Sequence, residues 1–216
     1  MLMTKDDMIR EEILREAQKL FQQYGLRKTT MEDIAKAMGK GKSTLYYYYS
    51  SKEEIFDAVV MKEMEEVFRN VQQAVQKAGS AEDKLKAFTL TKIRSVQKKL
   101  NLCKLVRGEM QDNMRCMKHL HAQYDTRETQ LVKEILSYGV SNGEFTKQIG
   151  KELDILPSVM VSSLRGLERD MFTESKYAKL EPRMESIMSI MIRGLQNNQP
   201  NGKKHPAPHL KTQEQR

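Results

Sequence analysis

The sequence predicts an all-α protein, and three observations lead to this fold class. Long stretches are free of proline and rich in glutamate, lysine, leucine, methionine and glutamine, which favour helix by propensity. Runs of alternating valine, isoleucine and threonine, which would indicate strands, are missing from the sequence. Apolar residues instead recur at spacings of three and four, as on one face of an amphipathic helix. We expect about nine helices.

Composition and charge narrow the class of protein further. The chain has 216 residues, of which 39% are hydrophobic and 31% charged, as in a soluble protein with a substantial core. Its net charge is +8, and residues 27–52 hold six basic residues against two acidic ones, which indicates an anionic partner. Since no long apolar run or signal-peptide core is present, we expect a cytoplasmic protein with no membrane span and with Cys103 and Cys116 reduced.

The first 50 residues predict three helices in succession. A first helix is expected over about 9–24, where apolar residues form one stripe that ends at Gly25. A second begins after Thr30, which precedes Asp33 by three residues as in a capping arrangement. This helix ends at Gly39, and the turn that follows leads into a third helix.

The third helix is expected over 42–49, where the sequence reads KSTLYYYY. Two short helices joined by a tight glycine turn, the second basic and aromatic, indicate a helix-turn-helix. The second helix must enter a DNA major groove about 12 Å wide, which favours small residues at its leading end. Leu45 and Tyr49 share one face and should be buried, so the three tyrosines between them should point toward solvent or a ligand.

The rest of the chain predicts a helical body and a tail. Helices are expected over 52–78, 81–99, 102–116, 119–141, 152–173 and 181–197. The polar, proline-bearing end of the chain indicates disorder. We therefore expect three parts: a helix-turn-helix domain over 1–52, a helical effector-binding and dimerisation domain over 53–197, and a disordered tail over 198–216.

These N-terminal motifs resemble the tetracycline-repressor (TetR) family. The resemblance covers roughly residues 8–58 and is carried by TTMEDIAKAMG at 29–39, KSTLYYYY at 42–49 and SKEE at 51–54. It implies a homodimeric repressor that leaves a palindromic operator in double-stranded DNA when a small-molecule effector binds the C-terminal body. Two positions depart from the family pattern, which usually has an apolar residue where Lys40 stands and serine or threonine where Gly41 stands.

The resemblance also implies which residues contact DNA. The corresponding positions in this sequence are Thr30, Lys42, Ser43, Thr44, Tyr46, Tyr47, Tyr48 and Lys52. Thr30 and Lys52 match phosphate-binding positions, and the others match the recognition helix. The alternative interpretations are a helix cap for Thr30, partial burial for Tyr46 and an ordinary surface lysine for Lys52.

The last two expected helices carry apolar stripes that indicate a dimer interface. A helix-turn-helix dimer must place its two reading heads about one DNA turn apart, roughly 34 Å, which favours a two-fold four-helix interface. The alternative is that the two helices pack only within one chain. The candidate interface residues are Leu156, Met160, Ser163, Leu164, Leu167, Met184, Met188 and Met191.

Methionine-rich stretches in the body allow two interpretations. They form either an ordinary core or the wall of an adaptable effector pocket, because methionine is flexible and polarisable. The candidate pocket residues are Phe88, Ile93, Cys103, Met110, Met114, Tyr124 and Leu131. Effector binding must change the spacing or angle of the reading heads, and the long helix over 52–78 is the element expected to transmit that change.

Two rival functions are weighed against DNA binding. An enzyme is disfavoured, because a P-loop would require glycine where Lys36 stands and a preceding strand. Cys116, His119 and His121 lack metal-site spacing, so we expect no metal, no cofactor and no catalytic residue. The other rival, a helical protein-interaction module without specific DNA binding, leaves the tyrosine, lysine and serine face at 42–49 unexplained.

Overall fold

The computed structural model describes the backbone of residues 4–106, 114–173 and 181–196, and the side chains of 4–95, 124–168 and 183–196. Within these ranges the secondary structure is helical apart from an isolated bridge between Phe145 and Gln196. The prediction of an all-α fold is confirmed.

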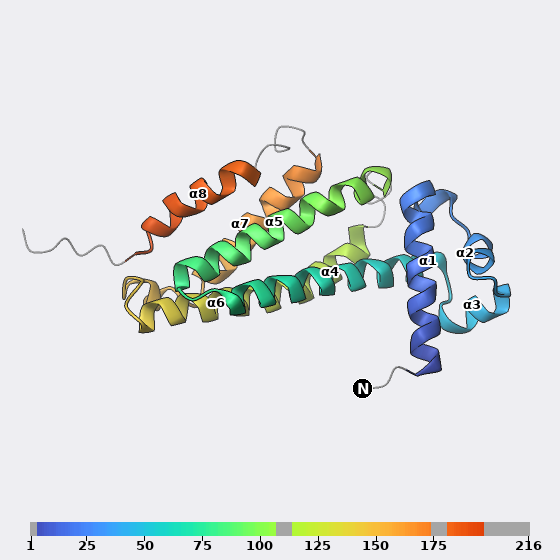
Figure 1. Cartoon of the computed structure of the whole chain (residues 1–216), viewed down its shortest axis with the longest axis horizontal. Helices are drawn as coiled ribbons and strands as arrows, with labels where there is room; N and C mark the ends of the chain where they lie inside the picture. The colour runs from blue at the N-terminus through green and yellow to red at the C-terminus, as the bar shows by residue number, and fades with distance from the viewer. Residues whose placement is uncertain (1–3, 107–113, 174–180, 197–216) are drawn as a thin grey trace, which may run out of the picture.

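Three helices form the N-terminal unit, at one end of the molecule (Figure 1): α1 (Lys5–Lys28), α2 (Met31–Ala37) and α3 (Lys42–Tyr48). Their apolar faces meet in a core of their own, to which the start of α4 (Lys52–Lys77) also contributes. The largest fully buried side chains of this core are Ile13, Ile34, Leu45 and Ile55. The helix-turn-helix therefore rests on α1 and on the first turns of α4.

The body consists of the rest of α4 together with α5 (Ala81–Val106), α6 (Met114–Ser141), a 3-10 turn (Ile149–Lys151), α7 (Leu156–Thr173) and α8 (Glu181–Arg193). Figure 1 shows α4 running from the N-terminal unit along the body, where α5 and α6 pack against α4, and α7 and α8 pack against α5. Their inward residues form a second core, which includes Val71, Leu85, Val132 and Val161. The described residues thus form two cores that are joined by one continuous helix.

The expected division between the two domains differs from the packing. Ile55, Phe56 and Val59 of α4 are buried in the N-terminal core, whereas Val71 and Val75 are buried in the body core. The change from one core to the other thus occurs inside α4, several turns after the boundary expected at residue 52. The reason is that a continuous helix can offer successive turns to two different cores.

The number of helices also differs from the expectation. Where helices were expected over 81–99 and 102–116, α5 runs without a break to Val106, and α6 begins at Met114. No glycine or proline lies between Ala81 and Val106 to stop the helix. The described residues contain eight α-helices. None of these helices has a stretch long and apolar enough to span a membrane.

Candidate nucleic-acid interface

The start of α2 is held by a reciprocal capping box, as the sequence predicts. The Thr30 hydroxyl accepts a hydrogen bond from the Asp33 backbone N–H at 3.1 Å and donates to the Asp33 carboxylate at 2.7 Å. The Thr30 backbone N–H donates to the same carboxylate at 2.9 Å. These bonds hold the pKa of Asp33 below its ordinary value. Thr30 is exposed beside this cap, so it serves as a cap whether or not it also contacts DNA.

The turn between α2 and α3 depends on glycine at one position. Gly39 has a φ of 63°, in the left-handed region that residues other than glycine rarely adopt. The N-cap of α3 is Gly41, which provides no side-chain hydrogen bond to the first turn. The departure from the family pattern at Gly41 therefore leaves α3 without a side-chain cap.

The outward face of α3 carries polar and aromatic side chains. Leu45 and Tyr49 are buried, as predicted, and anchor the helix in the N-terminal core. Tyr47 is 77% exposed and Tyr46 is 51% exposed, and Ser43 lies on the exposed surface with them. Two large phenol rings thus project from a helix of seven residues, with hydroxyl groups that can donate to phosphates or bases.

Tyr48 was expected to point toward solvent or a ligand, but its side chain packs within the protein. It is half-buried against α1, where its hydroxyl donates to the Asp6 carboxylate at 2.9 Å. The Arg10 guanidinium lies 5.3 Å from the Tyr48 ring centre and 5.6 Å from that of Tyr49, within cation–π range. Partial desolvation and the hydrogen bond to Asp6 raise the pKa of Tyr48. The side chain therefore fastens α3 to α1.

The remaining expected contacts lie in the first turn of α3 and at the start of α4. Lys42 is exposed and pairs with the exposed Glu32 at 3.3 Å, a contact weak enough to exchange for a phosphate. Thr44 is half-buried, in the first turn of α3. Lys52 is half-buried, and its ammonium group donates to backbone carbonyls at the end of α1. Sequence reasoning did not identify these acceptors.

The expected effector-pocket residues lie on the inner side of the body where they are described. Phe88 and Ile93 are buried in the body core, and Leu131 packs against it. Tyr124 is buried too, but its hydroxyl faces α4, where it donates to the Glu65 carboxylate at 3.1 Å. The candidates Cys103, Met110 and Met114 lie outside the residues whose side chains are described.

Sequence reasoning missed a buried ionic cluster in the same part of the body. The Lys92 ammonium of α5 lies 2.6 Å from the Glu128 carboxylate of α6 and 3.2 Å from the Glu168 carboxylate of α7. The sequence signal was a lysine at an inward position of the stripe that contains Leu85 and Phe88. One cation thus links two carboxylates from neighbouring helices.

Three of the expected interface residues are instead buried within the single chain. Leu164 of α7 and Met184 and Met188 of α8 belong to the body core, so little of their surface could contact a second copy. The reason is that the apolar stripes of α7 and α8 face α5 and α6. Leu156, Met160 and Leu167 also pack against that core, whereas Ser163 and Met191 are exposed.

A different set of apolar side chains is exposed on α7, on α8 and just before α7. Of this set, sequence reasoning named Met191 as an interface residue and not the others, because it assigned one apolar stripe to each helix. The exposed residues other than Met191 are Ile155, Val159, Ile187 and Ile190. We call these four residues and Met191 the outer apolar face. A shallow hollow beside it is lined by Ser158, Val159, Ser162 and Ser163.

A capped short helix, a glycine turn and an outward-facing recognition helix define a helix-turn-helix DNA-binding protein. The model of the bacterial regulatory proteins of the tetR family matches residues 13–59. The chain is 28% identical over 152 residues to the HTH-type transcriptional repressor KstR2 of Rhodococcus jostii, covering 67% of this chain and 71% of that protein. Residues 13–59 thus match the DNA-binding domain of TetR-family transcriptional regulators, and the relatives that the chain resembles are named as transcriptional regulators.

Two solved structures show the same fold. A transcriptional regulator from Cytophaga hutchinsonii has 27% sequence identity and a TM-score of 0.67, over 87% of this chain and 98% of that one. A TetR-family regulator from Mesorhizobium loti has 19% identity and a TM-score of 0.69, over 90% of this chain and all of that one. The similarity therefore extends through the body, well beyond residues 13–59.

Proposed function

We propose that this regulator is a repressor that binds a palindromic operator as a homodimer and leaves it when a small-molecule effector enters the body. The observation that carries DNA recognition is the exposed row of Ser43, Tyr46 and Tyr47 on α3, next to the capped start of α2. Hydroxyl groups at these places can donate to phosphates and base edges. The similarity to a protein named as a repressor supports the direction of regulation.

The experiment is fluorescence anisotropy of a labelled duplex from the region upstream of this chain's own gene. We expect saturable binding that weakens steeply with salt, because phosphate contacts release counterions. A duplex of the same composition in scrambled order is the control and should bind only weakly. If neither this duplex nor any recovered by random-site selection binds above the scrambled control, the DNA-binding proposal is wrong and a protein-interaction role replaces it.

The outer apolar face supports the dimer proposal. Ile190 is 66% exposed and Met191 is 56% exposed. Both lie on α8, which belongs to the body and lies away from α3 (Figure 1). Ile155 and Val159 line one hollow with Gly194, just after α8, and neighbouring exposed apolar residues are typical of protein interfaces. On α7, Ser162 and Ser163 line a hollow with Val159 and are small enough for a second pair of helices to approach closely. In this arrangement the two reading heads lie at the ends of the dimer.

Contacts on both sides of α4 support a route from the effector to DNA. On the body side, the Arg127 guanidinium donates to the Glu65 carboxylate at 2.6 and 3.2 Å and lies 4.1 Å from the Phe68 ring centre. The hydrogen bonds from Arg127 hold the pKa of Glu65 below its ordinary value. Tyr124 donates to Glu65 and, at 3.3 Å, to the Met61 carbonyl. These contacts fasten α6 to the middle of α4.

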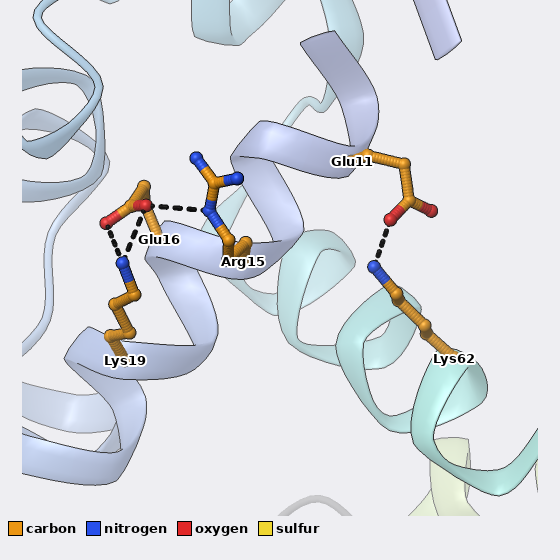
Figure 2. A network of polar contacts seen from close by, with 5 residues as sticks. All are labelled: Glu11, Arg15, Glu16, Lys19 and Lys62. Carbon is orange, nitrogen blue, oxygen red and sulfur yellow. Dashed lines mark hydrogen bonds and ion pairs between the residues drawn. The ribbon is translucent and has the colours of Figure 1, made fainter. Parts of the chain in front are cut away.

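The same turn of α4 is fastened to α1 on its other side. Lys62 forms an ion pair with Glu11 of α1, whose side chains point toward each other in Figure 2. Glu63 accepts a hydrogen bond from the Gln18 amide of α1 at 2.6 Å. These contacts to α6 and to the middle of α1 thus all involve residues 61–65 of α4. A shift of α6 on effector binding would move α4, and with it the helix-turn-helix.

The coupling is tested with a compound found by thermal-shift screening that also releases the duplex. The variant is Arg127→Met, which removes the contact to Glu65 but keeps a long apolar stem. We expect this variant to keep the thermal shift while losing most of the DNA release. Lys133→Met, an exposed change on the same helix, is the control. Full release from the Arg127 variant would exclude this route.

A further inference from the structure

Lys52 is the first residue of α4, but its ammonium group lies against the end of α1. The Nζ atom donates to the carbonyl oxygens of Leu26 at 2.8 Å, Arg27 at 3.1 Å and Thr29 at 3.0 Å. A lysine ammonium has three N–H donors, and here each has an acceptor. A phosphate could therefore be bound only at the cost of one of these three bonds.

The electrostatics of the two helices agree with this arrangement. The N-terminus of a helix has partial positive charge, so a lysine in its first turn is unfavourable unless it reaches other acceptors. The rest of the first turn of α4 follows that rule, with a Ser51 cap and the acidic Glu53 and Glu54. The last carbonyls of a helix have no intrahelical partner and attract a cation. Lys52 therefore stabilises the end of α1.

The backbone that Lys52 contacts leads directly into the helix-turn-helix. At Gly25 the helix bends, with a φ of 81°. The buried Thr29 donates from its hydroxyl to the Gly25 carbonyl at 2.7 Å, which closes the segment. The next residue, Thr30, is the N-cap of α2. The position of the segment 26–29 thus determines where α2 begins.

We propose that Lys52 is a positioning residue for operator binding, which acts by holding the segment 26–29 and with it the start of α2 at a fixed place relative to α4. This role replaces the direct phosphate contact that the family resemblance implies. It rests on the proposed DNA binding, since it concerns how α2 and α3 are presented to the duplex. Through these hydrogen bonds, α4 is linked to the helix-turn-helix by polar contacts as well as by the covalent chain.

The test uses the full chain and a labelled duplex that wild-type protein selects from a random pool. The variants are Lys52→Met, which keeps the stem length without the charge, and Lys52→Arg, which keeps the charge. A planar guanidinium suits a phosphate but not three carbonyls that converge on one nitrogen. Both variants should bind roughly tenfold more weakly, as expected when charge-assisted hydrogen bonds are removed. Neither should change the slope of log affinity against log salt.

The control is Lys42→Met, at the exposed lysine that opens α3. This change should flatten the slope by about 0.9 for each phosphate that the protein no longer neutralises. Equal flattening in Lys52→Met, or full affinity in Lys52→Arg, would overturn the positioning role in favour of a direct phosphate contact. Affinity is measured well below each variant's unfolding temperature, where a change that only reduced stability would bind as wild type. A failure of wild-type protein to select any duplex would instead count against the proposed function.

A second measurement needs no DNA and applies to any variant that folds. Amide hydrogen exchange of residues 26–31 should be faster in Lys52→Met than in wild type, while residues 8–20 of α1 exchange as before. If Lys52→Met does not fold, the same comparison is made with Lys52→Arg. Unchanged exchange over residues 26–31 would show that Lys52 does not hold this segment.

Discussion

Four consecutive tyrosines, residues 46–49, occupy three environments. Within α3 each step turns the side chain by about 100°, and Tyr49 follows the helix in extended backbone. Tyr49 is buried in the N-terminal core, and Tyr48 is fastened to Asp6 of α1. Tyr46 and Tyr47 are left on the exposed face, with their rings against solvent. Identical side chains therefore have different roles that depend on their position in the chain relative to α3.

The hydroxyl of Tyr47 should contribute to DNA binding and not to folding. In Tyr47→Phe we expect roughly tenfold weaker binding, because the variant cannot form one hydrogen bond to the duplex. The unfolding temperature should not change, since the hydroxyl lies on a side chain that is 77% exposed. Tyr138→Phe, on an exposed tyrosine of the body, is the control and should leave anisotropy titrations unaltered. Unchanged affinity in Tyr47→Phe would remove this hydroxyl from the interface.

The buried Lys92 is expected to be essential for the stability of the body. In Lys92→Met the Glu128 and Glu168 carboxylates, both close to the ammonium, would remain buried without their cation. Such a change costs about 3–5 kcal/mol of unfolding free energy. Urea unfolding measures the loss, with Lys133→Met, an exposed lysine on α6, as the control. A loss no larger than that of the control would mean that the carboxylates reach solvent.

The same cluster predicts a pH dependence. Burial raises the pKa of Glu168, although Lys92 opposes this, and Glu128 on α6 and Arg165 on α7 also face the group. Since the folded-state pKa exceeds the unfolded one, the folded protein binds this proton more tightly, and wild type gains stability as pH falls through the folded pKa. Glu168→Gln lacks this gain. Its stability relative to wild type should therefore decrease as the pH is lowered through the raised folded-state pKa of Glu168. A difference independent of pH would contradict the assignment.

Among the helices, the short α2 and the long α5 both begin at a hydroxyl side chain that caps the backbone N–H of an aspartate. Thr30→Ala should reduce the unfolding free energy by about 1 kcal/mol, as should Ser80→Ala at the start of α5. Ser80 makes the equivalent bonds, at 3.0 Å from the Asp83 N–H and 2.7 Å to its carboxylate. Of these two variants, only Thr30→Ala should weaken DNA binding, because α2 supports α3. Equal affinities would separate the cap from DNA recognition.

Helices and caps could be predicted from the sequence because the signals are local. The spacing of apolar residues and the Thr30 and Asp33 pair each lie within a few positions of one another. The acceptors of Lys52 could not be predicted in this way, because they lie 23 to 26 positions away in the chain. The partners of Tyr48 and Lys92 are more distant still, and no local pattern contains them.

The proposed dimer surface could be predicted only in part, at Met191, for a related reason. Apolar spacing identifies that a helix has a buried face, but not whether another part of the chain or a second copy covers it. In α8 the stripe through Met184 and Met188 is covered by the chain's own body. The residues between and beyond them, Ile187, Ile190 and Met191, remain exposed. A helix with two apolar faces requires the tertiary structure to assign each face.

For the whole molecule, the outer apolar face predicts how dimerisation controls DNA binding. Ile190→Glu places a charge at the centre of the proposed contact without entering the core, since Ile190 is 66% exposed. We expect a folded monomer, with a normal helical circular dichroism spectrum and half the dimer mass by light scattering. Met188→Glu should instead unfold the body, because Met188 is buried. Met8→Glu, at an exposed apolar residue of α1, should leave the dimer intact.

The Ile190→Glu variant should lose more operator affinity than any variant with a single change in α3. A dimer engages two half-sites together, and the second contact gains from the effective concentration that the first one provides. The monomeric Ile190→Glu protein should therefore bind a full palindrome no better than an isolated half-site. Its affinity for the palindrome should be lower than that of wild type by a factor of about 100 or more. Titrations of both duplexes measure this ratio. A folded Ile190→Glu protein that remains dimeric would place the interface elsewhere, whereas a monomer that retains full operator affinity would show that one reading head is sufficient.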